Sequence, residues 1–198
     1  MKKTIICNIP MRSNLNPQKY VSTNPKYLPS SEQEYVYPIN SFLSETVKNS
    51  DTLKAILIVQ KDNKDCWQKN LETFKKELNE IAQKNGAKVD SISEIGSNFN
   101  QEKATHEQLI MDLVDRIDAD SHIMVDITYG SKSLPIILFT VLNFATNHLH
   151  CEVDNIVYGE VSFDEDNKLI KDSAKLYDII PLYQGYQSKI ISIKLKFQ

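Results

Sequence analysis

The stretch DSHIMVDITYGSKSLPIILFTVLNFATNHLH, from Asp120 to His150, decides the fold. Ile123, Met124, Val125 and Ile127 form an apolar and largely β-branched run, which predicts a strand buried on both faces. A polar turn follows at 128–133. An apolar helix is predicted from Leu134 to His148, with Pro135 in its first turn, where a missing N–H costs nothing.

In open parallel α/β sheets, ligands bind beyond the carboxyl ends of the strands, where such a turn lies. The N–H groups in the first turn of a helix have no partners within the helix, and the helix dipole favours an anion there. Lys132 adds a full positive charge to this turn. We therefore expect an anion site here, with a phosphate group as its ligand.

The composition is that of an ordinary globular protein, with 41% hydrophobic and 25% charged residues. A length of 198 residues suits one domain with a sizeable core, or one domain with a small appendage. The formal net charge of −3 provides no positive field that would attract nucleic acid. We therefore expect no direct DNA binding, and a phosphate ligand must be held locally.

Cysteine and histidine give no sign of a disulfide framework or a metal site. Cys7, Cys66 and Cys151 are few and scattered, and the histidines lack the spacing of metal ligands. Glycine-rich dinucleotide and triphosphate loops are absent too, so we expect no metal and no cofactor. The sequence shows neither a signal peptide nor an apolar run that could span a bilayer. A cytoplasmic protein without a membrane partner is expected.

Strands and helices alternate along the chain. The predicted strands are 3–9, 55–60, 87–95, 123–127 and 153–159, and the predicted helices are 39–47, 66–83, 107–117 and 134–148. This alternation predicts an α/β fold, a Rossmann-like three-layer sandwich with a mostly parallel central sheet in the strand order 3-2-1-4-5. We expect this domain to span 1–185, with a hairpin at 163–169 and an extended piece at 177–182. Strict alternation at 189–197 predicts a C-terminal β extension, 186–198, as an edge strand or the start of a further segment.

A second candidate loop follows the first strand. Asn8, Arg12 and Ser13 lie just past its end, at the start of a long proline-rich segment from Pro10 to Pro38. So long an irregular connection is usually functional or mobile, and a solvated surface loop is the alternative. Because the first and fourth strands are neighbours in the order 3-2-1-4-5, this loop and the 128–133 turn are expected to flank one crevice. The turns after the second and third strands would rim it.

Two residues near this crevice have competing interpretations. Asp126 could be a catalytic carboxylate, but an Asp just before such a turn more often accepts hydrogen bonds from loop amides and fixes the turn. No nearby motif supplies a second carboxylate for acid–base hydrolysis. Trp67 could stack on a base, but it begins the apolar stripe of the helix 66–83, which favours a place in the core.

The residues Asp126–Gly130, DITYG, resemble the D-x-T-H-G motif of CRISPR-associated CARF proteins. The likeness extends, in the family's order, to Cys66–Trp67, Glu94–Ser97, Ser131–Pro135, Val157–Glu160 and Leu176–Ile179. The sequence departs from the family in two places. Tyr129 replaces the motif histidine, and the first loop, Asn8–Ser13, is not the glycine- and threonine-rich turn that is common in the family.

The resemblance implies a Rossmann-like sensor that binds cyclic oligoadenylates made by type III CRISPR complexes, with cyclic tetra-adenylate favoured. It implies a homodimer, because a two-fold pair presents the same loops twice to a ligand with rotational symmetry. Three uses follow: a ring nuclease that degrades the messenger, a binding-only regulator, or the sensor of a longer effector. A Rossmann-like binder of another phosphorylated nucleotide is the remaining alternative.

Cleavage would need no metal, because a positioned ribose 2′-OH can attack the adjacent phosphorus while amides and cations stabilise the developing charge. We expect a slow ring nuclease of this kind. The expected catalytic residues are Lys132, Arg12 and Ser13. The expected ligand-binding residues are Asn8, Ile9, Pro10, Met11, Lys61, Trp67, Gly96, Asp126, Thr128, Tyr129, Gly130, Ser131 and Ser133.

Overall fold

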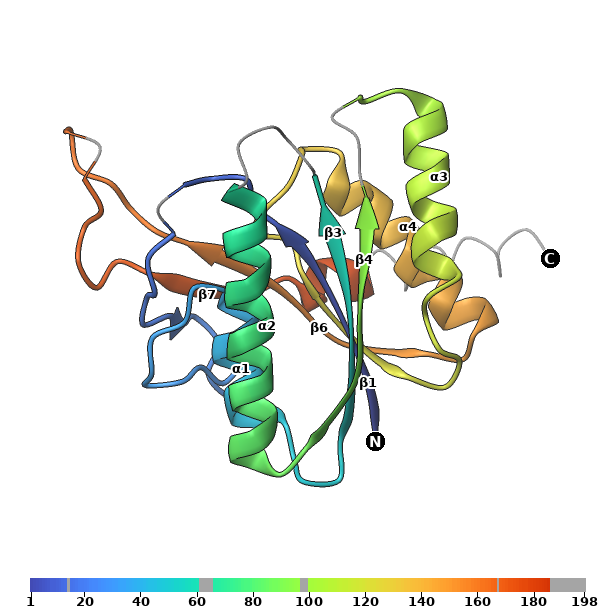
Figure 1. Cartoon of the computed structure of the whole chain (residues 1–198), viewed down its shortest axis with the longest axis horizontal. Helices are drawn as coiled ribbons and strands as arrows, with labels where there is room; N and C mark the ends of the chain where they lie inside the picture. The colour runs from blue at the N-terminus through green and yellow to red at the C-terminus, as the bar shows by residue number, and fades with distance from the viewer. Residues whose placement is uncertain (14, 61–65, 97–99, 167, 186–198) are drawn as a thin grey trace.

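A sheet covered by helices on both faces forms the centre of the computed structural model (Figure 1). The structure describes residues 1–13, 15–60, 66–96, 100–166 and 168–185. The strands are β1 (Lys2–Ile9), β2 (Val21–Ser22), β3 (Thr52–Val59), β4 (Lys88–Gly96), β5 (His122–Asp126), β6 (Glu152–Glu160) and β7 (Lys175–Asp178). The helices are α1 (Pro38–Thr46), α2 (Cys66–Asn85), α3 (Lys103–Val114) and α4 (Leu134–His148).

The described strands form one sheet in the order β2-β7-β6-β5-β1-β3-β4. From β4 to β6 all neighbours are parallel, β7 is antiparallel to β6, and β2 is parallel to β7. The five parallel strands have the predicted order 3-2-1-4-5, and the α/β, Rossmann-like three-layer fold is confirmed. β1 is buried from Lys3 to Ile9, as expected of a parallel strand covered on both faces.

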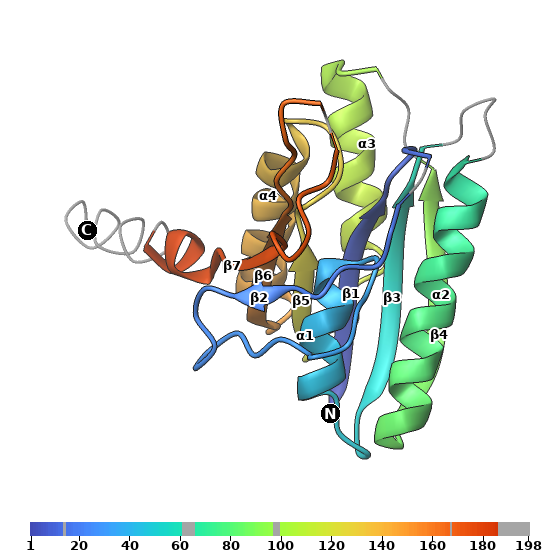
Figure 2. The ribbon, with the colours of Figure 1, turned by 90° about the vertical axis from the view of Figure 1, so that its left-hand side faces the viewer.

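Side chains of β1 alternate between two cores. Ile5 and Ile9 pack with Phe74 beneath α1 and α2, whereas Ile6 packs with Leu138 beneath α3 and α4. Figure 2 shows α2 and α4 on opposite sides of the sheet. Because β1 and β5 are parallel neighbours, the loops that follow them leave the same edge of the sheet.

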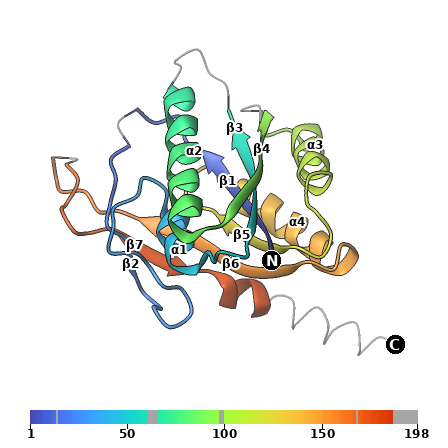
Figure 3. The same cartoon turned by 60° about the horizontal axis from the view of Figure 1, so that its bottom comes forward.

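The segment between β1 and α1 is folded onto the protein, beside α1 (Figure 3). Tyr20, Leu28 and Tyr37 are no more than 3% exposed and join the core beneath α1 and α2. The backbones of Gln18 and Tyr35 exchange two hydrogen bonds within it. The segment is therefore partly packed rather than solvated throughout, because Tyr20, Tyr37 and Leu28 carry enough apolar surface to be buried, whereas Arg12 and Ser13 remain exposed.

The chain after β6 differs from the prediction in one place. A bridge between the two ends of the hairpin at 163–169 confirms that hairpin. Residues 180–185, expected in part to be extended, are helical instead. Asp178 explains the difference, because its Oδ1 accepts a hydrogen bond from the Ile180 N–H (3.0 Å) and caps the first turn. The C-terminal strand predicted at 189–197 lies outside the described residues.

The helix α4 begins and ends where it was predicted. By contrast, α3 begins at Lys103 rather than Glu107, because its polar first turn carries no apolar period. It ends at Val114 rather than Ile117. Among the helices that the structure describes, none is both long and apolar enough to cross a membrane.

Candidate functional site

The loops after β1 and β5 meet at Gly130. This glycine has a φ of +122°, and a Cβ placed on it would lie 2.4 Å from Leu134 Cδ2 and 3.4 Å from Asn8 Cγ. A side chain at position 130 would therefore collide with the start of α4, and the turn lies directly against Asn8. The expectation that the two loops flank one crevice is confirmed.

A hollow of about 650 Å³ lies between these loops, a size that suits a nucleotide-scale ligand. Both loops and two glutamines line it: Asn8, Pro10, Met11, Arg12, Gln60, Gln101, Thr128, Tyr129, Gly130 and Ser131. Asn8 is only 5% exposed, and among the described residues its side-chain amide makes a single long contact, from Nδ2 to the Ile9 carbonyl (3.5 Å). A buried amide with spare hydrogen-bonding capacity thus borders the hollow.

A second hollow of about 370 Å³ shares Arg12, Thr128 and Tyr129 with the first. Its other lining residues come from the segment after β1 and from the end of β6 with the hairpin: Ser13, Leu15, Asn16, Gln18, Tyr20, Tyr158, Gly159, Glu160, Val161, Phe163 and Leu169. The Arg12 guanidinium lies 6.0 Å from the centroid of the Phe163 ring. We call the two hollows together the groove.

The free backbone donors lie in the turn rather than in the first turn of α4, where they were expected. The N–H of Leu134 donates to the Ser131 carbonyl (3.0 Å), and those of Ile136 and Ile137 donate to the Ser133 carbonyl (3.1 Å). That part of the prediction is wrong, because the turn's own carbonyls satisfy the helix. Within the described part of the chain, the N–H groups of residues 129–133 have no acceptor. Consecutive free donors of this kind form a concave site for an anion.

Asp126 holds the start of the 128–133 turn in place. It is 1% exposed, its Oδ1 accepts a hydrogen bond from the Thr128 N–H (2.8 Å), and its Oδ2 accepts one from the Ile39 N–H (3.2 Å). Burial raises the pKa of this carboxyl to about 6, although the hydrogen bonds from Thr128 and Ile39 act in the opposite direction. The contacts support the structural interpretation of Asp126, whose side chain borders neither hollow.

Tyr129, which stands in place of the motif histidine, forms part of the wall of both hollows. Its hydroxyl donates to the Val36 carbonyl (3.5 Å), and its ring packs edge-on against Tyr37 at 6.1 Å. Burial raises the pKa of the Tyr129 hydroxyl, and the nearby Asp126 adds to this. Tyr129 therefore joins the turn to the segment before α1. Thr128 joins the turn to β6, because its Oγ1 accepts a hydrogen bond from the Gly159 N–H (2.8 Å).

Several predicted site residues lie away from the groove. Lys132 is exposed and lines neither hollow, and the described residues provide it with no ion pair. The Ser133 hydroxyl bonds to Gln101 and Ser131 instead. Ile9 is buried in the core, and Gly96 is exposed at the end of β4.

Trp67 is partly buried and packs against the core beneath α1 and α2, which supports the core interpretation. Lys61 lies outside the described residues. The groove also contains residues that were not predicted, notably Tyr20, Tyr158, Glu160 and Phe163. The likeness of 157–160 to a family motif was the one signal that pointed toward any of them.

Among the described residues, one group could hold a metal ion: His122, Glu152 and Asp154. It lies at the start of β5 and β6, at the opposite end of these strands from the groove. His122 Nδ1 is 2.9 Å from Asp154 Oδ1, so the two side chains already form a cross-strand pair. Neither a scan against protein-family models nor a search of curated proteins matches this chain.

Proposed function

We propose that this protein binds cyclic oligoadenylates, cyclic tetra-adenylate in particular, in the groove, and that it does so as a homodimer. The observation that supports this most is the run of free N–H groups at 129–133, of which residues 129–131 line the larger hollow. These N–H groups belong to a turn whose sequence resembles the D-x-T-H-G motif. The turn lies where the direction of winding of the sheet reverses, between β1 and β5.

The groove is close to neutral among the residues that the structure describes. Arg12 is the one cationic side chain that lines the two hollows, and Glu160, in the smaller hollow, is acidic. A phosphodiester carries a single negative charge, which neutral amides and one guanidinium can balance. A phosphomonoester carries close to two charges at neutral pH and would favour further cations. At any one contact the groove therefore suits a phosphodiester better than a phosphomonoester.

We further propose that the bound ring is cleaved slowly and without a metal. The ribose 2′-OH attacks the adjacent phosphorus, the P–O5′ bond breaks, and a 2′,3′-cyclic phosphate and a free 5′-OH result. Arg12 and the turn amides stabilise the charge on the phosphorus oxygens, with Lys132 contributing from outside the hollow. Asn8, Ser13 and Ser131 position the ribose and phosphate for in-line attack.

One observation favours a binding-only sensor instead. The Tyr129 hydroxyl, at the position of the motif histidine, is engaged with Val36, and no described histidine lines either hollow. A site without a general base can position a ring without breaking it.

The test is incubation of excess protein with cyclic tetra-adenylate and, separately, cyclic hexa-adenylate in EDTA, followed by chromatography. Linear products that end in a 2′,3′-cyclic phosphate are expected, and Arg12→Ala should abolish them. Rings that bind and stay intact for hours would identify a binding-only sensor. Rings that do not bind at all would overturn the proposal.

A further inference from the structure

The two hollows of the groove differ in chemistry. The larger hollow contains Gly130 and Ser131 of the 128–133 turn, whose N–H groups accept no partner from the described chain. The smaller hollow has an apolar and aromatic lining instead, which includes Leu15, Tyr20, Val161, Phe163 and Leu169. The faces of a nucleobase are flat and largely apolar, so a base suits this second lining better than a phosphate does.

Arg12 and Phe163 both line the smaller hollow, and the guanidinium lies over the Phe163 ring at 6.0 Å from its centroid. This separation exceeds the roughly 3.5–4 Å of a direct stack, and it falls about 1 Å short of the roughly 7 Å that two stacked contacts occupy. Both side chains are exposed, Phe163 by 44%. A small outward movement of either side chain therefore admits a planar base between them.

Hydrogen bonds hold the backbone at both residues and leave the side chains available. Asn70 is 6% exposed, and its Nδ2 donates to the carbonyls of Pro10 (2.6 Å) and Arg12 (3.0 Å). Phe163 forms an antiparallel bridge with Leu169 across the hairpin. Within the described ranges, the Arg12 guanidinium has neither a hydrogen bond nor an ion pair. The two side chains thus start from fixed positions and can close on a ligand.

We propose that an adenine base of the ligand binds between the Arg12 guanidinium and the Phe163 ring, and that the phosphate of the same nucleotide binds at the free N–H groups of the larger hollow. Arg12 lines both hollows. A guanidinium can stack its flat face on a base while the N–H groups at its edge bind a phosphate. One nucleotide therefore spans the groove, with Arg12 at the junction. The identity of the base rests on the proposed function, because a stacking site accepts any flat base.

Two substitutions separate stacking from charge. Arg12→Lys keeps the positive charge but removes the planar group, and Phe163→Leu keeps an apolar side chain but removes the ring. We expect each to weaken cyclic tetra-adenylate binding at least about fivefold in isothermal titration calorimetry, as the loss of one base stack predicts. Phe163→Tyr restores the ring and should bind within about twofold of wild type.

Matched controls change the same groups outside the groove. Arg116→Lys alters an arginine whose side chain is 37% exposed, and Tyr27→Leu removes an aromatic ring from a residue that is 63% exposed. Neither residue lines a hollow, so both variants should bind as wild type does.

A linear dinucleotide that carries 2-aminopurine tests the stack without a ring-shaped ligand. 2-Aminopurine loses fluorescence when it stacks on an aromatic group. We expect wild type to quench the probe and Phe163→Leu to quench it much less.

The outcomes distinguish the base site from the proposed function. Rings that Arg12→Lys and Phe163→Leu bind as tightly as wild type would overturn the base site and leave the proposed function standing. Quenching that depends on Phe163, in a protein that binds no ring, would support the base site and refute the proposed function. Neither ring binding nor quenching would overturn both.

Discussion

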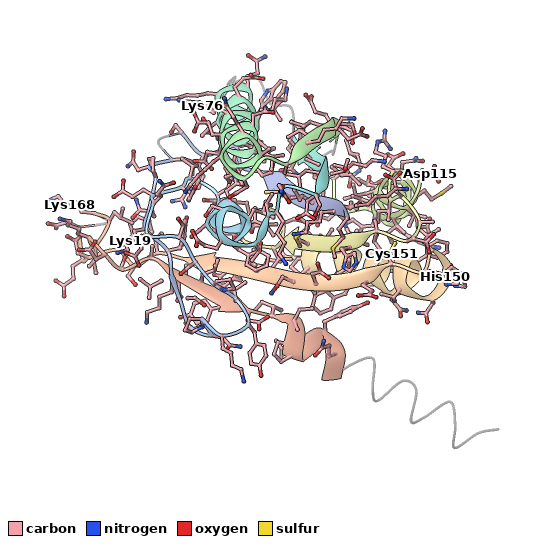
Figure 4. All side chains as sticks on the ribbon, turned by 90° about the horizontal axis from the view of Figure 1, so that it is seen from below. Lys19, Lys76, Asp115, His150, Cys151 and Lys168 are labelled. Atoms are coloured by element: carbon pink, nitrogen blue, oxygen red, sulfur yellow. The ribbon has the colours of Figure 1, made fainter. Side chains whose placement is uncertain are left out.

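The helices α2 and α4 both cover the central sheet, one on each face, but their outer sides differ. α2 turns Phe74 inward and places charged residues outside, including Lys75 paired with Glu72 and Lys76 paired with Glu80. Figure 4 shows Lys76 projecting from α2 away from the sheet. α4 turns Leu138 inward and leaves Ile136, Thr140 and Phe144, none of which is charged, exposed on its outer side. The helix on one face of the sheet thus has a charged outer side, whereas the outer side of the helix on the other face is uncharged.

Matched alanine substitutions on the two helices should give the largest contrast in stability. Phe74→Ala removes a ring that is 0% exposed and lies 4.9 Å from Tyr37, so it should lower the free energy of unfolding by about 3–5 kcal/mol. Phe144→Ala should cost less than about 1 kcal/mol in the monomer. Urea denaturation at several protein concentrations measures both. Equal costs at every concentration would mean that Phe144 is packed within its own chain, and the comparison would fail.

The buried Asp126 should make stability depend on pH in a way that the exposed pairs of α2 do not. Because burial raises its pKa to about 6 from 3.8, the native state holds a proton that the unfolded state has released between these values. The free energy of unfolding should therefore fall as pH rises through this window, by up to about 3 kcal/mol, and this penalty stays constant above it. Denaturation of wild type and Asp126→Asn from pH 4 to 7 isolates the effect. If the free energy of unfolding depends on pH equally in wild type and Asp126→Asn, Asp126 is not the cause.

Arg12 lines the groove and Lys132 does not, so these two cations should differ in their effect on binding. Arg12→Ala should weaken cyclic tetra-adenylate binding more than tenfold, since a hydrogen bond to a charged group is worth roughly 1.5–3 kcal/mol. Lys132→Ala should weaken it less than about fivefold, because an exposed charge pair contributes about 0–1 kcal/mol. Isothermal titration calorimetry measures the affinity of both variants for cyclic tetra-adenylate. The reverse order would place the phosphates at the start of α4 instead of in the groove.

Substitutions at two glycines that follow or end a strand should give the smallest difference in stability. Gly130→Ala introduces a side chain at φ +122° against Leu134 and should cost about 1–3 kcal/mol in stability. Gly96→Ala meets nothing within 4 Å and should change stability by no more than about 0.5 kcal/mol. Thermal unfolding measures both. A Gly130 variant as stable as wild type would show that the turn has room to move.

Much of the fold could be predicted because its information is local. The apolar runs of β1, β3 and β5 identify buried parallel strands, and Pro135 marks the start of α4. The strand order then follows from general rules of connection, which also bring the loop after β1 to the 128–133 turn.

The rest depends on contacts between residues far apart in sequence. The second hollow requires Arg12 to meet Phe163, which no local pattern indicates. Free N–H groups were predicted in the first turn of α4. They lie in the preceding turn instead, because the Ser133 carbonyl accepts hydrogen bonds from the first turn of α4. The segment before α1 is contacted at Val36 by Tyr129, and the start of α1 is contacted at Ile39 by Asp126, both from a distant part of the chain.

The contacts from Tyr129 and Asp126 also determine when the early part of the chain can complete its folding during synthesis. Val36 and Ile39, at the end of the early segment, are held by Tyr129 and Asp126, which lie 93 and 87 positions later. At roughly 5–20 residues per second, a ribosome needs about 5–20 s to make the intervening chain. This tyrosine-rich segment, one of the first parts to emerge, therefore lacks its contact with Tyr129 until the 128–133 turn has been made. A nascent chain that stops before Asp126 should expose this segment to protease more than the full chain does.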